Sequence, residues 1–121
     1  MIILDTNIII ELFKGNQQIL QKLKSSNDDF AISSIALMEL FYGAHNKKEV
    51  NEIEKFLSSF SLLHITTEIS KSATQLIKAY AKSYTLDIPD SLIAATVLSH
   101  NATLFTLNVK DFKYIPNLKL L

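Results

Sequence analysis

The chain of 121 residues contains no cysteine and no arginine. Without cysteine there can be no disulfide, no thiol nucleophile and no zinc–thiolate site. All 12 basic residues are lysines, so no guanidinium group is present to bind a phosphate through two parallel hydrogen bonds. The 12 acidic residues balance the lysines, and a formal net charge of zero argues against nucleic-acid binding driven by bulk positive charge.

Glycine and proline are scarce, with two of each, and no linker, repeat or low-complexity tract interrupts the chain. We therefore expect a single domain over residues 1–121, with 48% hydrophobic residues to build one sizeable core. No apolar run approaches the roughly 18 residues of a membrane span. Asp5 and Glu11 interrupt any N-terminal signal peptide. The expectation is a soluble, cytoplasmic protein with no membrane contact.

Short apolar runs alternate with amphipathic segments along the whole chain. Apolar runs predict strands at residues 1–4, 30–33, 62–65, 103–107 and 118–121. Hydrophobic periodicity and end signals predict helices at residues 5–15, 16–26, 34–43, 47–60, 67–84 and 88–101. This alternation predicts an α/β domain with a central, mostly parallel sheet. In such sheets, ligands bind beyond the carboxyl ends of the strands.

Two carboxylates lie in segments that carry no other charge. Asp5 is the only charged side chain in the first ten residues, and Glu39 is the only one between Asp29 and Lys47. Burying an unpaired carboxylate costs several kcal/mol. A helix N-cap accounts for Asp5 as well as a binding role does. Glu39 is harder to explain as a cap, because it falls inside its helix, in an expected apolar stripe formed by Ile35, Met38 and Tyr42.

Three further acids stand near the end of the chain. Asp87 and Asp90 are the only charges between Lys82 and Lys110, and Asp111 follows the strand predicted at 103–107. The position of Asp87 favours a helix N-cap. Asp90 falls in the first turn of the same helix, where an acid either complements the helix dipole or binds a ligand.

The predicted topology brings four of these acids to one edge of the sheet. Asp5 and Asp111 follow strands, Asp90 begins the helix before the 103–107 strand, and the helix of Glu39 can lie across the same edge. Two carboxylates about 4 Å apart repel by roughly 4 kcal/mol at an effective dielectric constant near 20. Such a cluster persists only if it is protonated or binds cations. Oxygen ligands without cysteine favour Mg²⁺ or Mn²⁺, and no ligand spacing relates the three histidines, His45, His64 and His100.

Four segments of the chain resemble, in order, the signature blocks of PIN-domain ribonucleases of the VapC type. They read LDTNIII, MELFYGA, PDSLIAATVL and TLNVKDF, and they run from the first residues to position 112. The resemblance implies a single PIN domain with a three-layer α/β/α sandwich. It also implies a Mg²⁺- or Mn²⁺-dependent endoribonuclease that hydrolyses RNA phosphodiester bonds and acts as the toxin of a toxin–antitoxin pair.

The resemblance also implies roles for individual residues. Asp5, Glu39, Asp90 and Asp111 correspond to the family's acidic quartet, with Asp5 and Asp90 as direct or water-mediated metal ligands. Glu39 corresponds to a further ligand or to the group that orients the attacking water, and Asp111 to a ligand or a water-positioning group. The polar residues that support the quartet correspond to Thr6, Asn7, Thr106 and Asn108.

One position departs from the family pattern. Many relatives carry a basic residue within the last block, whereas this chain has Leu107 there, and the nearest cation is Lys110. The sequence therefore leaves open which group contacts a substrate phosphate.

The implied partners are an RNA substrate and a cognate VapB-like antitoxin that blocks the site. The helix predicted at 34–43 is apolar nearly all round. We therefore expect part of it to face that antitoxin or a second copy of the chain in a homodimer.

Two other functions fit part of the pattern. A phosphoaspartate protein of the receiver or hydrolase type would use Asp5 as nucleophile and Lys110 as phosphate clamp. That function leaves Glu39 unexplained, and no second acid stands beside Asp5. A catalytically silent PIN-like module that binds RNA or protein would have no need of four intact acids.

Overall fold

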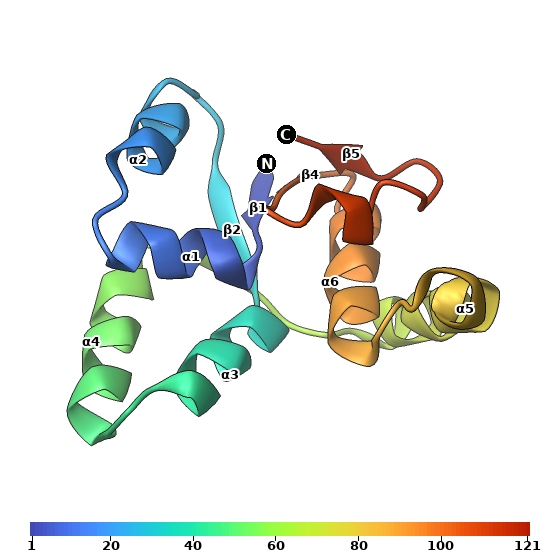
Figure 1. Cartoon of the computed structure of the whole chain (residues 1–121), viewed down its shortest axis with the longest axis horizontal. Helices are drawn as coiled ribbons and strands as arrows, with labels where there is room; N and C mark the ends of the chain where they lie inside the picture. The colour runs from blue at the N-terminus through green and yellow to red at the C-terminus, as the bar shows by residue number, and fades with distance from the viewer.

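A five-stranded parallel sheet forms the centre of the computed structural model, which describes residues 1–121 (Figure 1). The strands are β1 (Ile2–Leu4), β2 (Phe30–Ser33), β3 (Ser61–Leu63), β4 (Thr103–Phe105) and β5 (Lys119–Leu120). Their order across the sheet is β3-β2-β1-β4-β5. The chain therefore builds outwards from β1 in both directions, and the point between β1 and β4 is where parallel sheets bind ligands.

Helices cover both faces of the sheet, with α1 to α4 towards one side and α5 and α6 on the other (Figure 1). Their bounds are α1 (Thr6–Phe13), α2 (Gln17–Lys24), α3 (Ser34–Gly43), α4 (Lys47–Phe56), α5 (Thr67–Tyr84) and α6 (Ile88–Ser99). Two 3₁₀ turns, η1 (Leu57–Ser59) and η2 (Val109–Asp111), follow α4 and β4. No helix is both long enough and apolar enough to cross a membrane.

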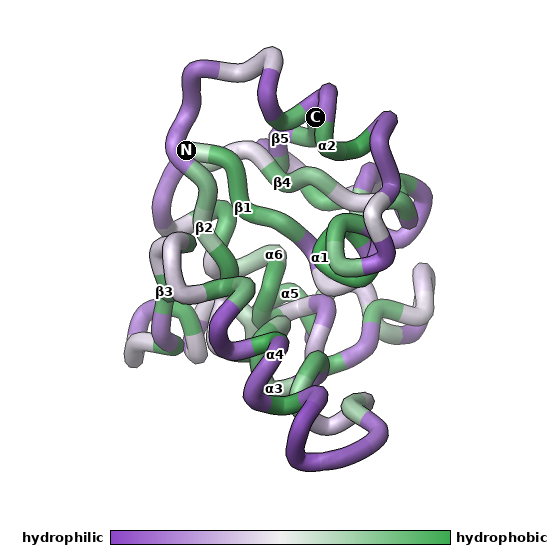
Figure 2. Tube along the Cα trace, turned by 90° about the vertical axis from the view of Figure 1, so that its left-hand side faces the viewer, coloured by the Kyte–Doolittle hydropathy of each residue, from purple (hydrophilic) through white to green (hydrophobic).

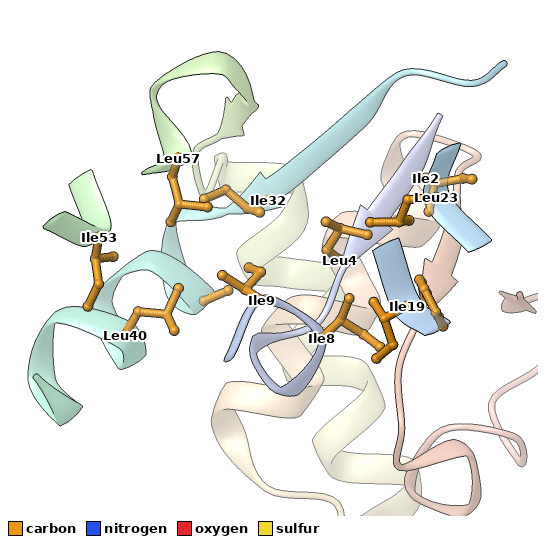
Figure 3. Close-up of a cluster of buried hydrophobic side chains, with 12 residues drawn as sticks. Ile2, Leu4, Ile8, Ile9, Ile19, Leu23, Ile32, Leu40, Ile53 and Leu57 are labelled. Atoms are coloured by element: carbon orange, nitrogen blue, oxygen red, sulfur yellow. The ribbon is translucent and has the colours of Figure 1, made fainter. Parts of the chain in front are cut away.

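Alternation along β1 divides the core into two halves. Ile2 and Leu4 point to one face and pack with side chains of α1 to α4, as Figure 3 shows. Ile3 points to the other face and packs against α6 and the segment after β4, where Phe112 is fully buried. In a smaller cluster, Ile69 and Ala73 of α5 pack against Ala95 of α6. The trace is accordingly hydrophobic through β1 and α6 (Figure 2).

Side-chain caps determine where the helices begin. The side chains of Asp5, Asn16, Ser33, Asn46, Thr66 and Asp87 each accept a backbone N–H at the start of one helix, from α1 to α6 in that order. Such caps contribute about 0.5–2 kcal/mol each. Asp5 and Ser33 stand at the carboxyl ends of β1 and β2 and are both buried, so at these two points the chain passes from strand to helix inside the core.

The predicted fold class, an α/β/α sandwich with a parallel sheet, is confirmed. Some boundaries differ from the prediction. The strand predicted at 103–107 ends at Phe105, because its neighbour β1 ends at Leu4 and Asp5 leaves the sheet to cap α1. The strand predicted at 62–65 runs from Ser61 to Leu63, so it begins one residue earlier and ends two residues earlier. The helix predicted at 47–60 continues beyond Phe56 only as the 3₁₀ turn η1.

Candidate active site

Asp5 lies at the carboxyl end of the central strand and is only 5% exposed. One carboxylate oxygen, Oδ1, accepts the N–H of Thr6 at 2.8 Å, and Oδ2 accepts the hydroxyl of Thr106 at 2.7 Å. Burial raises the pKa of Asp5, the two hydrogen bonds oppose that rise, and the charges of Asp111 and Asp87 add to it. Asp5 is therefore both a helix cap and a buried acid without a cation.

A hydrogen-bond network ties the start of α1 to the loop after β4. The Asn7 side chain accepts the N–H of Leu107 at 3.1 Å and makes longer contacts, 3.4 and 3.5 Å, with Asp5 and Thr106. The Thr106 hydroxyl also accepts the N–H of Asn108 at 3.0 Å. Thr106 and Asn7 thus hold Asp5 in place with their side chains, whereas Asn108 takes part through its backbone.

The Thr106 hydroxyl allows a test of this network. Thr106→Val should lower the free energy of unfolding by about 1–3 kcal/mol at neutral pH, because the Asp5 carboxylate loses its buried donor. The hydroxyl favours the ionised form of Asp5, so its contribution is present when Asp5 is charged and is lost as the pH falls through the pKa of Asp5. Urea unfolding in EDTA at several pH values measures this difference.

A matched control is Thr96→Val. Thr96 is fully buried, and its hydroxyl donates to the neutral carbonyl oxygen of Leu92 at 2.7 Å. The stability cost of this variant should not depend on pH, since no titrating group receives the bond. If both variants showed the same pH dependence, the assigned role of Thr106 would be wrong.

Asp90 is half-buried in the first turn of α6, and its pKa is raised to about 7. Burial is the largest cause, and the charges of Asp87, Asp5, Asp111 and Glu39 follow in that order. Asp87 caps α6 as predicted, because its Oδ1 accepts the N–H of Asp90 at 2.8 Å. The other three predicted acids are thus within electrostatic reach of Asp90, although they come from distant parts of the sequence.

Glu39 approaches this site from α3. Its Oε1 accepts the Thr6 hydroxyl at 2.8 Å, which links α3 to the first residue of α1. The expectation that Glu39 lies in an apolar stripe is only half right: the residues beside it are apolar, but Met38 and Tyr42 are 55% and 95% exposed, and Glu39 is exposed with them. The outer face of α3 carries no covering element, so the stripe remains on the surface.

Asp111 lies in η2, half-buried, and donates its backbone N–H to Asn108 at 3.0 Å. Neither Asp111 nor the other three acids of the quartet forms an ion pair. The ion pairs of the structure join Met1 to Asp28 and Lys14 to Glu11, and the imidazole of His45 contacts the carboxylate of Glu49. The site therefore carries negative charge that no lysine neutralises.

No three carboxylate or imidazole side chains are arranged as a group that could hold a single metal ion. The charge and the oxygen donors nevertheless suit a hard divalent cation. Mg²⁺ typically keeps several waters and uses only one or two carboxylates, together with substrate phosphates. The residues fit such a loosely held ion better than a closed cage.

Two participants were not recognised as such from the sequence. Asp87, predicted only as a cap, contributes the largest charge effect on Asp90. Burial raises the pKa of the Tyr114 hydroxyl, and the charges of Asp90, Asp111 and Asp87, which act on it from nearby, raise it further. The sequence signal for Asp87 was its spacing of three residues from Asp90. This spacing suits a helix cap, and it also brings the two charges close together.

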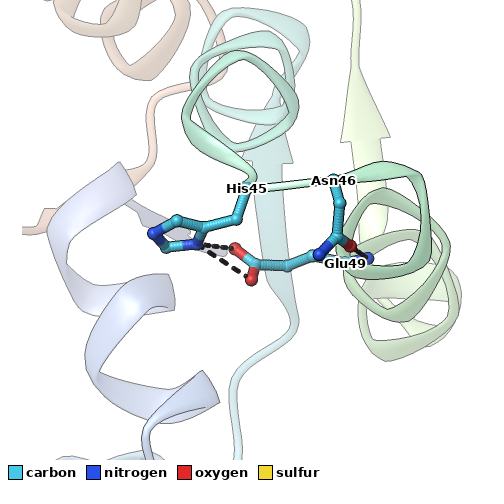
Figure 4. A network of polar contacts seen from close by, with 3 residues as sticks. All are labelled: His45, Asn46 and Glu49. Carbon is cyan, nitrogen blue, oxygen red and sulfur yellow. Dashed lines mark hydrogen bonds and ion pairs between the residues drawn. The ribbon is translucent and has the colours of Figure 1, made fainter.

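A separate cavity of about 280 Å³ lies between α1, α3 and α4. Its apolar lining consists of Ile9, Ile10, Phe13, Leu40, Ile53 and Phe56. Two polar residues of this lining pair with each other: His45 Nδ1 contacts the Glu49 carboxylate at 3.1 and 3.3 Å, and the Glu49 N–H donates to Asn46, the cap of α4 (Figure 4). This cavity is lined by none of the four acids of the quartet.

Comparison with known proteins gives consistent matches over the whole chain. The PIN domain family matches residues 2–118. A protein named Ribonuclease VapC from Rickettsia bellii is 38% identical over 99% of this chain and 94% of its own length. The structure of VapBC2 from Rickettsia felis, bound to a DNA fragment from its promoter, superposes with a TM-score of 0.84 at 34% identity, covering 100% of this chain and 98% of that one. The structure of VapBC-1 from Haemophilus influenzae superposes with a TM-score of 0.83 at 31% identity, covering 100% of this chain and 97% of that one.

Proposed function

Since this chain belongs to the PIN-domain family, we propose that it is an endoribonuclease of the VapC type that uses Mg²⁺ or Mn²⁺, and the toxin of a toxin–antitoxin pair. The ribonuclease function predicted from the sequence is confirmed by relatives that are named ribonucleases and match this chain over 94% of their own length. The proposed metal dependence is supported by the set of acids at one edge of the sheet, which have no cation partner within the protein.

Asp5 and Asp90 are the residues that would hold the metal ion, and Asp111 would position a coordinated water. When bound, the ion lowers the pKa of a coordinated water and stabilises negative charge on the phosphate. Thr106 and the N–H of Thr6 hold the Asp5 carboxylate in one orientation. Asp90 must lose its proton before it can serve as a ligand, because its pKa of about 7 leaves it partly protonated at neutral pH.

We assign Glu39 the role of orienting the attacking water. Thr6 donates to Oε1, and no protein group donates to Oε2. That free oxygen can orient a water molecule or accept its proton. Because Thr6 is also the first residue of the helix that Asp5 caps, the hydroxyl of Thr6 couples the orientation of Glu39 to that of Asp5.

Lys110 is the proposed contact for a substrate phosphate. It is exposed in η2, directly before Asp111, and forms no ion pair. Leu107 contributes an apolar side chain that is 53% exposed, so only its backbone N–H enters the site network. A lysine binds phosphate as a point charge, which suits a chain that lacks arginine.

We assign the antitoxin to the apolar cavity between α1, α3 and α4. Ile10, Phe13 and Phe56 are 40%, 41% and 38% exposed there, and the rings of Phe13 and Phe56 meet edge to face at 5.6 Å. An exposed apolar surface of this kind marks a protein-binding site. The solved structures that resemble this chain are toxin–antitoxin complexes. Pairing of two copies in a homodimer through the exposed face of α3 stays a prediction.

Ile10→Asp should weaken the complex with the antitoxin roughly 10- to 100-fold, because a charge enters the apolar contact. RNA cleavage by the free chain should not change. Calorimetric titration with the antitoxin measures the affinity. Leu121→Asp is the control, since Leu121 is also exposed (43%) but lies at the far end of the chain. Equal affinity of wild type and Ile10→Asp would exclude this surface.

The function is tested by incubating the purified chain with total RNA in a buffer that contains Mg²⁺. We expect discrete fragments whose mapped ends define the cleavage sequence. We also propose that the chain acts in the cytoplasm, where RNA is abundant. A chain that leaves every RNA intact, while still folded by circular dichroism, would overturn the proposal and favour the silent binding module.

A further inference from the structure

Three tyrosines pack together near the acidic residues, and two of their rings form a stack. The rings of Tyr84 and Tyr114 lie parallel, 4.2 Å apart and 8° from coplanar. Tyr80 meets both rings at an angle, at 6.0 Å from Tyr84 and 5.3 Å from Tyr114. One face of Tyr84 is therefore covered by Tyr114, whereas the side chain as a whole is 52% exposed.

The chain path places this stack next to the active site. Tyr84 ends α5, and three residues later Asp87 caps α6 and contacts Asp90. Tyr114 follows Asp111 by three residues in a continuous hydrogen-bonded turn. Three residues span at most about 11 Å. Both rings are thus joined by short segments to the elements that carry Asp87, Asp90 and Asp111. A strand of a few nucleotides can span the distance from the stack to these acids.

Two features of the stack are unusual for packing alone. The hydroxyl of Tyr114 is the buried side-chain polar atom that has no hydrogen-bond partner. Such groups are generally paired in folded proteins. The ring of Tyr84 is partly exposed to solvent, and contacts with Tyr80 and Tyr114 hold it in one orientation. Little conformational entropy is therefore lost if a further planar group stacks on it.

We propose that the exposed face of Tyr84 is a stacking platform for a nucleobase of the RNA substrate, next to the phosphodiester bond that is cleaved. This inference rests on the proposed function. Aromatic side chains bind unpaired bases by stacking, and the bases of a duplex are unavailable for it. Tyr84 is thereby a substrate-binding residue that selects single-stranded segments. Lys113, exposed and without an ion pair beside Tyr114, is available to the adjoining backbone.

The parallel geometry favours a base over a protein side chain as the occupant. A ring held 8° from its neighbour continues a stack of flat rings, which is how bases arrange themselves in a strand. The antitoxin is the other molecule that could cover Tyr84, and the experiment separates the two.

The test measures binding and not only cleavage. Short fluorescent oligoribonucleotides, homopolymers of A, U or C, are titrated into the Asp90→Asn chain, in which cleavage is blocked. Tyr84→Leu in that background should bind single strands about 5- to 150-fold more weakly. Tyr84→Phe retains the ring and should bind as the parent does. The chain has no tryptophan and four tyrosines, so quenching of tyrosine fluorescence reports the stacking, and Tyr84→Leu should lose most of it.

The outcomes separate this inference from the function it rests on. If the Asp90→Asn chain binds no RNA and the wild type cleaves none, both fail together. If RNA is bound and cleaved but Tyr84→Leu changes neither affinity nor quenching, the stacking platform alone is wrong. A loss of antitoxin affinity in Tyr84→Leu, with RNA binding unchanged, would make the surface a protein contact and would also overturn the inference.

Discussion

Asp90→Asn is expected to lower RNA cleavage by about 10³-fold or more, because the loss of a metal ligand removes several kcal/mol of transition-state stabilisation. The substitution keeps the size of the side chain and the backbone N–H that Asp87 accepts, so α6 stays capped. Cleavage of total RNA under single-turnover conditions measures the effect.

The same substitution should stabilise the metal-free protein above neutral pH. The pKa of Asp90 rises from its ordinary value of 3.8 to about 7 in the folded chain. A raised pKa of this kind contributes stability that is fully present below pH 3.8 and is lost as the pH rises through about 7. In EDTA at pH 8, Asp90→Asn should therefore unfold with a free energy on the order of 2–4 kcal/mol higher than wild type.

The control for both effects is Asp29→Asn, which changes an exposed acid far from the site in the sequence. It should leave cleavage unchanged, and as a surface substitution it should change the free energy of unfolding at pH 8 by no more than about 0.5 kcal/mol. A variant Asp90→Asn that cleaved RNA as wild type does would remove Asp90 from the site. One that was inactive and also less stable at pH 8 would show that the burial and repulsion assigned to Asp90 are wrong.

Chelation of divalent ions should abolish cleavage, and Mg²⁺ or Mn²⁺ should restore it. The carboxylates have no cation partner within the protein, so a bound ion also relieves their mutual repulsion. At about 100 times its dissociation constant, an ion that binds only the folded chain stabilises it by about 2.7 kcal/mol. Thermal unfolding with and without Mg²⁺ measures this shift.

The metal effect should itself depend on pH. Metal binding competes with the proton on Asp90, so the stabilisation by Mg²⁺ should be small at pH 5 and grow as the pH rises through about 7. Monovalent salt at equal ionic strength is the control for screening. Cleavage that persists in EDTA, or an equal shift of melting temperature in Asp90→Asn, would contradict the proposed metal site.

Much of the fold was predictable because its signals are local. The cap of α6 at Asp87 and the helix at 67–84 depend on residues a few positions apart, and both were found where expected. The end of β4 was not predictable in the same way. It is set by the point at which Asp5, about a hundred residues earlier, leaves the sheet.

By itself, the sequence determined the class of the fold, the absence of thiol and guanidinium chemistry, and the identity of the acids that follow the strands. These properties depend on composition and on the periods of strand and helix. Only the tertiary structure decided how the acids are held. The hydroxyl of Thr106 on Asp5, the exposed position of Glu39 beside Thr6, and the stack of Tyr84 on Tyr114 each join residues from separate elements. Distances of that kind depend on strand order and on the rotation of each helix about its axis, which no local pattern encodes.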